Sequence, residues 1–134
     1  MSSERPMSWS YLCVLIAGVL PLLSTGYAKF AGPGFDNRHP RDFLAGLTGA
    51  RARAHAAQLN GFEAFPLFAA AVLMAHQAGV DSGRIDLLAI IWVLLRLAYG
   101  VLYIANRATL RSLAWAGASA IWIALMVMAM LARS

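Results

Sequence analysis

The sequence contains few charged residues and almost no cysteine. Only 13% of its 134 residues are charged, and the single cysteine is Cys13. One cysteine cannot form an intramolecular disulfide, and a thiol within an apolar run usually behaves as a small inert hydrophobe. The sequence also lacks a nucleophile-base-acid set, a phosphate-binding loop and a cofactor fingerprint. These absences argue against a disulfide scaffold and against redox chemistry at Cys13.

Apolar residues make up most of the chain instead. They account for 60% of it, and the mean hydropathy is +0.65. Four apolar stretches, at 11–28, 54–78, 85–104 and 113–131, each approach the roughly 20 residues that span about 30 Å of hydrocarbon. None has the broad polar face of a soluble bundle helix. The sequence therefore predicts an all-α fold, a four-transmembrane-helix bundle in one domain over residues 1–134, in contact with membrane lipid.

The first apolar run also has an alternative reading. It could be a secretory signal with cleavage after Ala28. Its length suits a membrane span, and the three later helices need a partner to pack against. We therefore predict that it is the first span, with Pro21 removing one backbone donor and bending the helix.

Turn and capping residues mark the ends of the spans. The Gly, Pro, Asp and Asn content of residues 30–49 predicts a loop. Thr48 is expected to cap the second span, and Asp81 or Ser82 the third. In the fourth span, small residues spaced by four permit close helix contact, at Ala116, Ala120 and Ala124.

Positive charges gather on one side of the predicted spans. Two segments carry most of them, at Lys29, Arg38, Arg41, Arg51 and Arg53, and at Arg107 and Arg111. The opposite side holds only Arg5, Arg84 and Arg133. The positive-inside rule then makes both basic segments cytoplasmic and places both termini outside. The net charge of +5 reflects topology and site chemistry, so no nucleic-acid partner is expected.

Polar side chains lie within the second and third spans. Counted from the cytoplasmic face at 1.5 Å per residue, Glu63 is about 15 Å deep and Arg96 about 14 Å. A carboxylate in hydrocarbon costs at least a few kcal/mol unless it is paired or faces a wet cavity. The matching depths therefore predict that Glu63 and Arg96 can pair.

Helical spacing gives these spans two polar stripes that face a common cleft. Three residues fall on one side of the second span, Arg53, Asn60 and Glu63, and three on one side of the third, Arg96, Tyr99 and Tyr103, with Arg107 one turn beyond. Gln58 points roughly the opposite way from Asn60 and is expected to face another helix or subunit.

Several positive donors around a cleft suit an anionic ligand that bears carboxylates. The alternative is a set of interhelical hydrogen bonds that only fixes packing. His55 and His76 lie at opposite ends of the second span, so no metal site is expected.

Two motifs resemble those of the MAPEG family, membrane-associated proteins of eicosanoid and glutathione metabolism. The first is Gln58, Asn60 and Glu63 followed by Phe65-Pro66-Leu67-Phe68, and the second is Arg96-x-x-Tyr99-x-x-x-Tyr103 followed by Arg111. They occur in the expected order on the expected helices, and the resemblance covers nearly the whole chain. It implies a homotrimer of four-helix protomers that binds glutathione as a co-substrate at subunit interfaces, near the cytoplasmic side.

The resemblance also implies roles for individual residues. Asn60 and Glu63 would hold the backbone and amino end of glutathione, and Tyr99 and Tyr103 would hydrogen-bond along it. Gln58 would reach a neighbouring subunit's site. Arg111 resembles the arginine that stabilises the glutathione thiolate, although Arg107 is an alternative on spacing. A cation near sulfur lowers the thiol pKa from its reference value of about 8.5 and so favours the nucleophilic thiolate.

The chain departs from the family pattern at three positions. Ala56 stands four residues before Asn60, where the family usually has arginine, and Arg53 is the expected substitute. Ala64 stands where some relatives carry tyrosine, and Lys29 where several carry arginine.

The predicted function is that of a bacterial inner-membrane enzyme. It would use glutathione to conjugate a lipophilic electrophile or to reduce a lipid hydroperoxide, with the apolar substrate entering from the bilayer. The Ala56 departure favours an alternative, a catalytically silent membrane scaffold or lipid-binding protein. A small exporter of cationic drugs would need a carboxylate in the first span, which has none.

Overall fold

The computed structural model describes residues 7–133, and this part of the chain forms five helices. Their bounds are α1 Trp9–Phe30, α2 Pro40–Ala45, α3 Gly49–Gln77, α4 Ser82–Ile104 and α5 Ala108–Arg133. Four of them, all but α2, are long and apolar enough to cross a membrane. The four predicted spans are therefore confirmed, and each helix begins a few residues earlier than expected. Arg5 of the charge count and the side chain of Arg133 lie outside the described residues.

Side-chain caps fix two helix starts. Ser8 caps α1 by accepting a hydrogen bond from the Tyr11 amide at 3.2 Å. Of the two predicted caps of α4, Asp81 is the one that forms, by accepting from the Arg84 amide at 3.0 Å. Thr48 stands at the N-cap of α3, but its side chain makes no capping bond. The expected cap residues therefore mark the starts of α3 and α4, although Thr48 makes no side-chain hydrogen bond there.

The short helix α2 was not predicted. Pro40 opens it at the first helical position, where a fixed φ and a missing N–H carry no penalty. Its one buried residue, Leu44, packs with Ala28 and Ala54. The helix was missed because the segment is rich in loop-forming residues. Its six residues are also too few to show a helical repeat of apolar positions.

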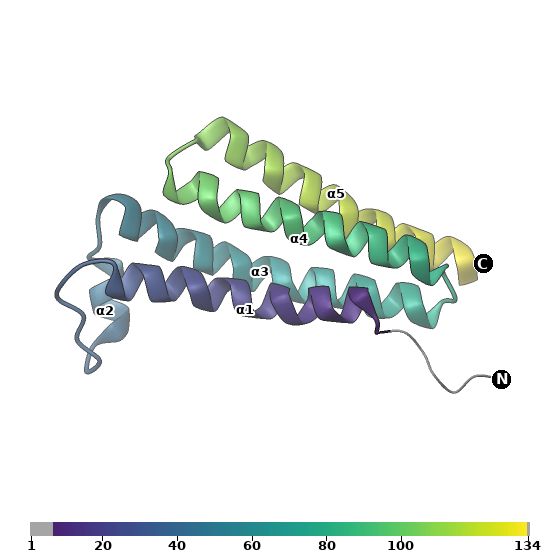
Figure 1. Ribbon diagram of the computed structural model, residues 1–134, viewed down its shortest axis with the longest axis horizontal. Helices are drawn as coiled ribbons and strands as arrows, with labels where there is room; N and C mark the ends of the chain where they lie inside the picture. Colours follow the sequence, from purple (N-terminus) through teal and green to yellow (C-terminus); the bar gives the residue numbers. More distant parts are fainter. Residues whose placement is uncertain (1–6, 134) are drawn as a thin grey trace.

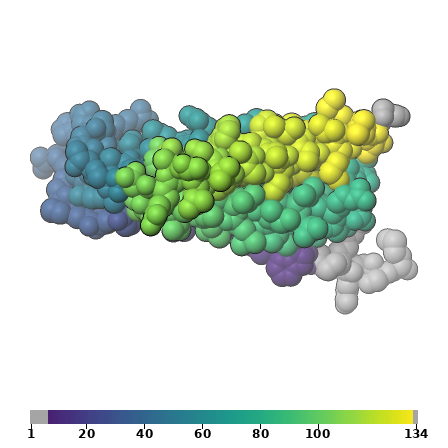
Figure 2. All heavy atoms as spheres, turned by 90° about the horizontal axis from the view of Figure 1, so that it is seen from above, coloured from purple at the N-terminus to yellow at the C-terminus, as the bar shows by residue number. Residues whose placement is uncertain are grey.

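The long helices form a four-helix bundle in which α3 and α4 contact each other and each also contacts both α1 and α5. Figure 1 shows both ends of the described chain at one end of the bundle, with α2 at the other. The space-filling view shows an elongated body with α5 running over the face seen from above (Figure 2). The sides of the central α3/α4 pair are therefore covered by different helices, which separates the spaces described below.

Small residues let these helices approach closely. A Cβ placed at Gly18 would lie 3.3 Å from the Phe65 ring, and one at Gly117 would lie 3.1 Å from Leu95. The buried alanines of α5 include Ala114 and Ala118, whereas two members of the predicted stripe, Ala116 and Ala120, are exposed. Within the protomer, close packing of α5 therefore uses Ala114 and Ala118, and the predicted stripe lies on a different side of the helix.

The aromatic centre of the bundle is a stacked ring pair. Phe68 of α3 and Trp92 of α4 lie with their centroids 3.8 Å apart and their planes within 3° of parallel. Both side chains are almost fully buried. This pair fixes the separation of the two central helices just beyond the polar residues.

Two arginines near the start of α3 bind the carbonyl ends of other helices. Arg51 donates to the carbonyls of Ala28 and Lys29 at 2.9 and 2.8 Å, at the end of α1. Arg53 donates to the Ile104 carbonyl at 3.0 Å, at the end of α4. These last-turn carbonyls have no intrahelical partner and favour a cation. Two of the arginines used above to predict the membrane orientation thus also join the start of α3 to the ends of α1 and α4.

The closest contact between α1 and α3 generates a prediction. Pro21 lies within α1 without ending it, and a Cβ at Gly61 would lie 2.8 Å from its Cγ. The proline ring cannot rotate away, so Gly61→Ala should lower the free energy of unfolding by about 1–3 kcal/mol. Thermal unfolding in detergent measures the change. Gly26→Ala is the matched control, because nothing lies within 4 Å of its Cβ position; equal effects of the two substitutions would contradict this account.

Candidate functional site

Part of each predicted polar stripe borders one cavity. A space of about 200 Å³ between α3, α4 and α5 is lined by Asn60, Glu63 and Arg96. Glu63 and Arg96, for which the sequence predicts matching depths, both border this space. Helix α5 supplies the opposite wall, with Trp115, Ser119 and Trp122.

The α5 wall was missed by reasoning from the sequence. Depth was compared only for Glu63 and Arg96, and the fourth span was considered only for its small residues. The available signal was a serine and two tryptophans recurring at helical spacing within that span. These residues give the cavity an aromatic side facing its polar side.

The predicted pairing of Glu63 with Arg96 is wrong within the protomer. No ion pair joins the two side chains in the part of the chain that the structure describes, residues 7–133. Arg96 is only 7% exposed and places its guanidinium carbon 4.2 Å from the Tyr99 ring centroid and 5.9 Å from that of Trp92. Glu63 instead lies exposed at the protomer surface. Aromatic faces thus attract the guanidinium where a carboxylate was expected.

Two polar atoms near this cavity are buried without a hydrogen-bond partner among the described residues. They are Oδ1 of Asn60 and Nε1 of Trp92, and both residues line the cavity. A buried polar group left unpaired costs about 1–3 kcal/mol. An unpaired cation thus lies beside the cavity together with an acceptor and a donor that are covered by the protein and have no partner of their own.

A row of cations and rings continues from Arg96 to the start of α5. Tyr99 and Tyr103 pack edge to face with centroids 5.6 Å apart. Arg111 then lies over the Tyr103 ring at 4.2 Å. Arg96, Tyr99 and Tyr103 therefore follow one another along α4, and Arg111 continues the row from α5, but neither tyrosine lines the cavity between α3, α4 and α5.

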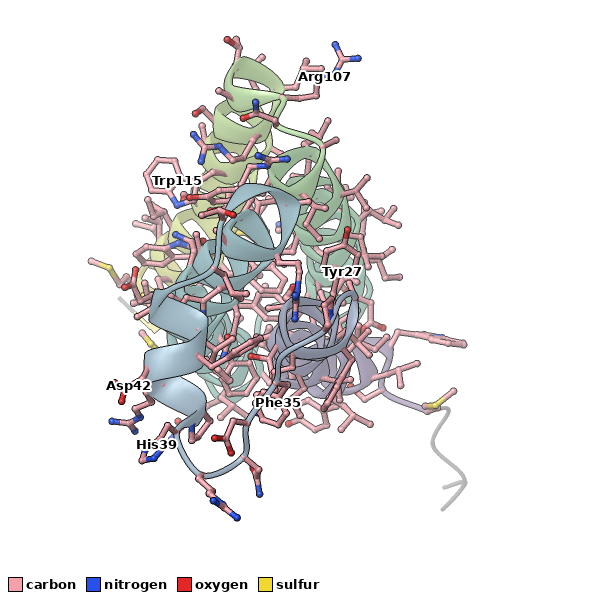
Figure 3. The ribbon with its side chains drawn as sticks, turned by 90° about the vertical axis from the view of Figure 1, so that its left-hand side faces the viewer. Tyr27, Phe35, His39, Asp42, Arg107 and Trp115 are labelled. Atoms are coloured by element: carbon pink, nitrogen blue, oxygen red, sulfur yellow. The ribbon has the colours of Figure 1, made fainter. Side chains whose placement is uncertain are left out.

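Of the two candidate thiolate-binding arginines, only Arg111 belongs to this row. Arg107 is exposed in the turn between α4 and α5. Figure 3 shows it at the outer edge of the bundle, pointing away from the helices. A helical count from Tyr103 cannot place Arg107, because α4 ends at Ile104 and the chain reverses before α5.

Arg53 does not line the cavity either. Its Nε donates to the Ile104 carbonyl at 3.0 Å, which fixes the guanidinium at the end of α4. The prediction that Arg53 shares the cleft with Asn60 and Glu63 is therefore wrong for the protomer. A free carbonyl end of α4 competed for this side chain, and spacing along α3 alone could not reveal it.

Gln58 faces away from Asn60, as predicted. Its Oε1 lies 3.2 Å from Nδ1 of His55. The residue lines a separate space of about 610 Å³ between α1, α2 and α3. Lys29 and Arg41 also border that space. Helix α3 therefore carries one set of polar side chains toward α4 and α5, and another toward α1 and α2.

The missing ion pair can be tested by removing the charge of Glu63. Glu63→Gln keeps the shape of the side chain, and we expect the free energy of unfolding to change by no more than about 0.5 kcal/mol. A buried ion pair broken on one side would cost about 3–5 kcal/mol. Thermal unfolding of the purified protein separates these outcomes, and a loss in the higher range would show that Glu63 and Arg96 are paired.

Comparison with known proteins gives one match. A sequence model described as the MAPEG family matches residues 9–131, which span all four long helices. Searches of curated proteins and of solved structures returned no match.

Proposed function

The chain belongs to the MAPEG family, and from this premise we propose that it is a glutathione-dependent transferase or peroxidase. It is an integral membrane protein with four helices able to cross the bilayer. The proposed substrates are lipophilic electrophiles or lipid hydroperoxides. We further propose a bacterial inner membrane, with the termini outside and the glutathione site facing the cytoplasm.

One observation carries this proposal: Asn60, Glu63 and Arg96 border a common cavity without satisfying one another. Glutathione has one ammonium and two carboxylates. Glu63 would receive the ammonium and Arg96 a carboxylate, while Oδ1 of Asn60 would accept from a peptide N–H. These bonds would satisfy the groups that the protomer leaves unpaired.

The proposed chemistry follows from the row that ends at Arg111. Tyr99 and Tyr103 would lie along the tripeptide, and Arg111 would stabilise the thiolate after its proton leaves for solvent. In a transferase, the sulfur then forms a bond to an electrophilic carbon. That carbon either releases its leaving group as an anion or belongs to an activated double bond, whose electron pair then takes up a proton from solvent. In a peroxidase, two glutathione molecules become a disulfide while the hydroperoxide becomes an alcohol and water. Trp115 and Trp122 would hold the apolar substrate against the cavity.

The role of Arg111 can be tested against that of Arg107. Glutathione added to the purified protein should produce the ultraviolet absorbance of a bound thiolate. Arg111→Ala should abolish this signal, because the cation beside Tyr103 is lost. Arg107→Ala is the matched control and should preserve the signal, since its side chain is exposed. The reverse pattern would assign the role to Arg107, and no signal from the unmodified protein at millimolar glutathione would reject thiolate formation.

We propose that the working unit is a homotrimer with glutathione between protomers. Two observations support a site shared between chains. Glu63 is exposed on the cavity side of α3, and Gln58 and Lys29 border a second open space on its other side. A neighbouring chain that presents its Gln58 side to this cavity would complete the set of contacts.

Mixed oligomers test this sharing directly. Gln58→Ala and Arg111→Ala change opposite sides of the proposed interface, so each variant alone should bind glutathione poorly. Co-expression should restore part of the binding, because some interfaces then combine two unaltered sides. Calorimetry on purified mixed oligomers measures the number of sites. A mixture that binds no better than the two variants separately would place the whole site within one protomer.

A second candidate is a catalytically silent membrane scaffold or lipid-binding protein. Ala56 stands where the family usually has arginine, and the expected substitute Arg53 is held at the Ile104 carbonyl. These features favour weaker glutathione binding. Under this alternative the unmodified protein forms no thiolate, so the measurement above also decides between the two functions.

A further inference from the structure

A second space lies on the other side of α4, between α4 and α1. It has a volume of about 190 Å³, and its walls are mainly Leu20, Leu23, Leu97, Val101 and Ile104. Several of these side chains are exposed in the protomer and would meet the bilayer. In Figure 3, Tyr27 of this groove and Trp115 of the α5 cavity lie on opposite sides of the bundle. The two spaces are therefore separate openings.

Arg96 borders both of them. It lines the groove between α1 and α4 as well as the cavity between α3, α4 and α5. Its side chain is more than nine-tenths buried, and no hydrogen bond or ion pair involves it among residues 7–133. A buried cation without an anion is costly in an apolar setting. The inner end of the groove therefore attracts an anionic group.

The groove continues inward into a recess with further polar groups. This recess of about 30 Å³ is lined by Arg96, Ser24, Ala17 and Pro21, among others. Pro21 has no N–H, so the Ala17 carbonyl lacks its usual intrahelical donor. The recess is large enough for one water molecule, which needs roughly 10–15 Å³. An anion at the end of the groove would thus find a guanidinium, a hydroxyl and room for a bridging water.

The position of Arg96 along α4 limits what this anion can be. Ile104 ends α4 eight residues later, so the backbone of Arg96 lies about 12 Å below the helix end. Its guanidinium lies beside the rings of Trp92 and Tyr99, which belong to the turns on either side of that level. The phosphate of a phospholipid stays at the level of the headgroups and cannot reach that depth. The outer end of the groove is marked by Tyr27, a residue type that favours the membrane interface. The fitting ligand is polar at the interface, apolar along the leucine walls and anionic at its inner end.

We propose that this groove binds a phospholipid whose acyl chain is shortened and ends in a carboxylate. The headgroup remains at the interface, the chain lies between α1 and α4, and its terminal carboxylate pairs with Arg96. An extended chain advances about 1.25 Å per carbon, so about nine to ten carbons reach the required depth. Such chains result from oxidative cleavage of unsaturated lipids. The proposal does not require glutathione binding.

The test measures lipid binding by native mass spectrometry on the full chain, without glutathione. Three phosphatidylcholines share one headgroup and one long chain and differ only in the second chain, which is nonanedioyl, nonanoyl or pentanedioyl. We expect the nonanedioyl lipid to bind about tenfold more tightly than the nonanoyl lipid, equivalent to about 1.4 kcal/mol for the carboxylate. The pentanedioyl lipid should gain nothing, because its carboxylate stops short of Arg96. Equal binding of all three would overturn the proposal.

Two glycine substitutions test the place of binding. Gly100 lines the groove, and a Cβ there meets nothing within 4 Å, so Gly100→Leu places a side chain in the groove. It should remove the preference for the nonanedioyl lipid. Gly26→Leu also enters open space but lies outside the residues lining the groove, and it should retain the preference. Thermal unfolding confirms that both variants are folded.

Other outcomes identify other occupants. Loss of the preference in both variants, or in neither, would place the lipid elsewhere on the protein. Free nonanedioic acid binding as tightly as the phospholipid would show that the headgroup has no part and would reject the phospholipid. If a second copy of the chain covers the groove, none of the three lipids binds there, which also rejects the proposal. Glutathione binding by the same preparation is scored separately, so either proposal can fail alone.

Discussion

A guanidinium buried in an apolar bundle is the feature on which the rest of the site depends. Arg96 is surrounded by the helices of the protomer, and aromatic faces are its nearest favourable contacts. Cation–π attraction contributes about 2 kcal/mol or more in desolvated settings and so offsets part of the several kcal/mol that burying an ion costs. The protein therefore holds a cation that a ligand can stabilise further. The spaces beside Arg96 are the routes by which such a ligand arrives.

The packing of the bundle explains how Arg96 can border spaces on both sides of α4. Helices α3 and α4 contact each other, and each also contacts α1 and α5. Close approach relies on small residues, with Gly61 against Pro21 and Gly117 against Leu95. Lipid tails are as apolar as leucine, so interlocking packing of this kind replaces a hydrophobic driving force between helices. A central helix pair held in this way presents different faces to different neighbours.

Arginine has three different uses in this chain, and position decides which one applies. Arg51 and Arg53 bind carbonyls at helix ends. Arg96 and Arg111 lie over aromatic rings on the path of the proposed glutathione site, while Arg107 is exposed in a turn. Family membership fixes the general class of the protein, and the proposed enzyme rests on groups that the protomer leaves unpaired. The exposed carboxylate of Glu63 on one side of α3 and the amide of Gln58 on the other fit the proposed site between subunits.

The sequence by itself determined the four spans, the start of the third span at Asp81 or Ser82, the opposite directions of Asn60 and Gln58, and the succession of Arg96, Tyr99 and Tyr103 along one side of α4. Hydropathy and helical periodicity are local properties, so they are readable from residue order. Only the tertiary structure decided that Arg96 faces rings instead of Glu63, that the end of α4 binds Arg53, and that α5 supplies the aromatic wall. Each of these outcomes is a competition among partners on different helices. Spacing within one helix fixes the direction of a side chain, but which partner it reaches depends on how closely the other helices pack.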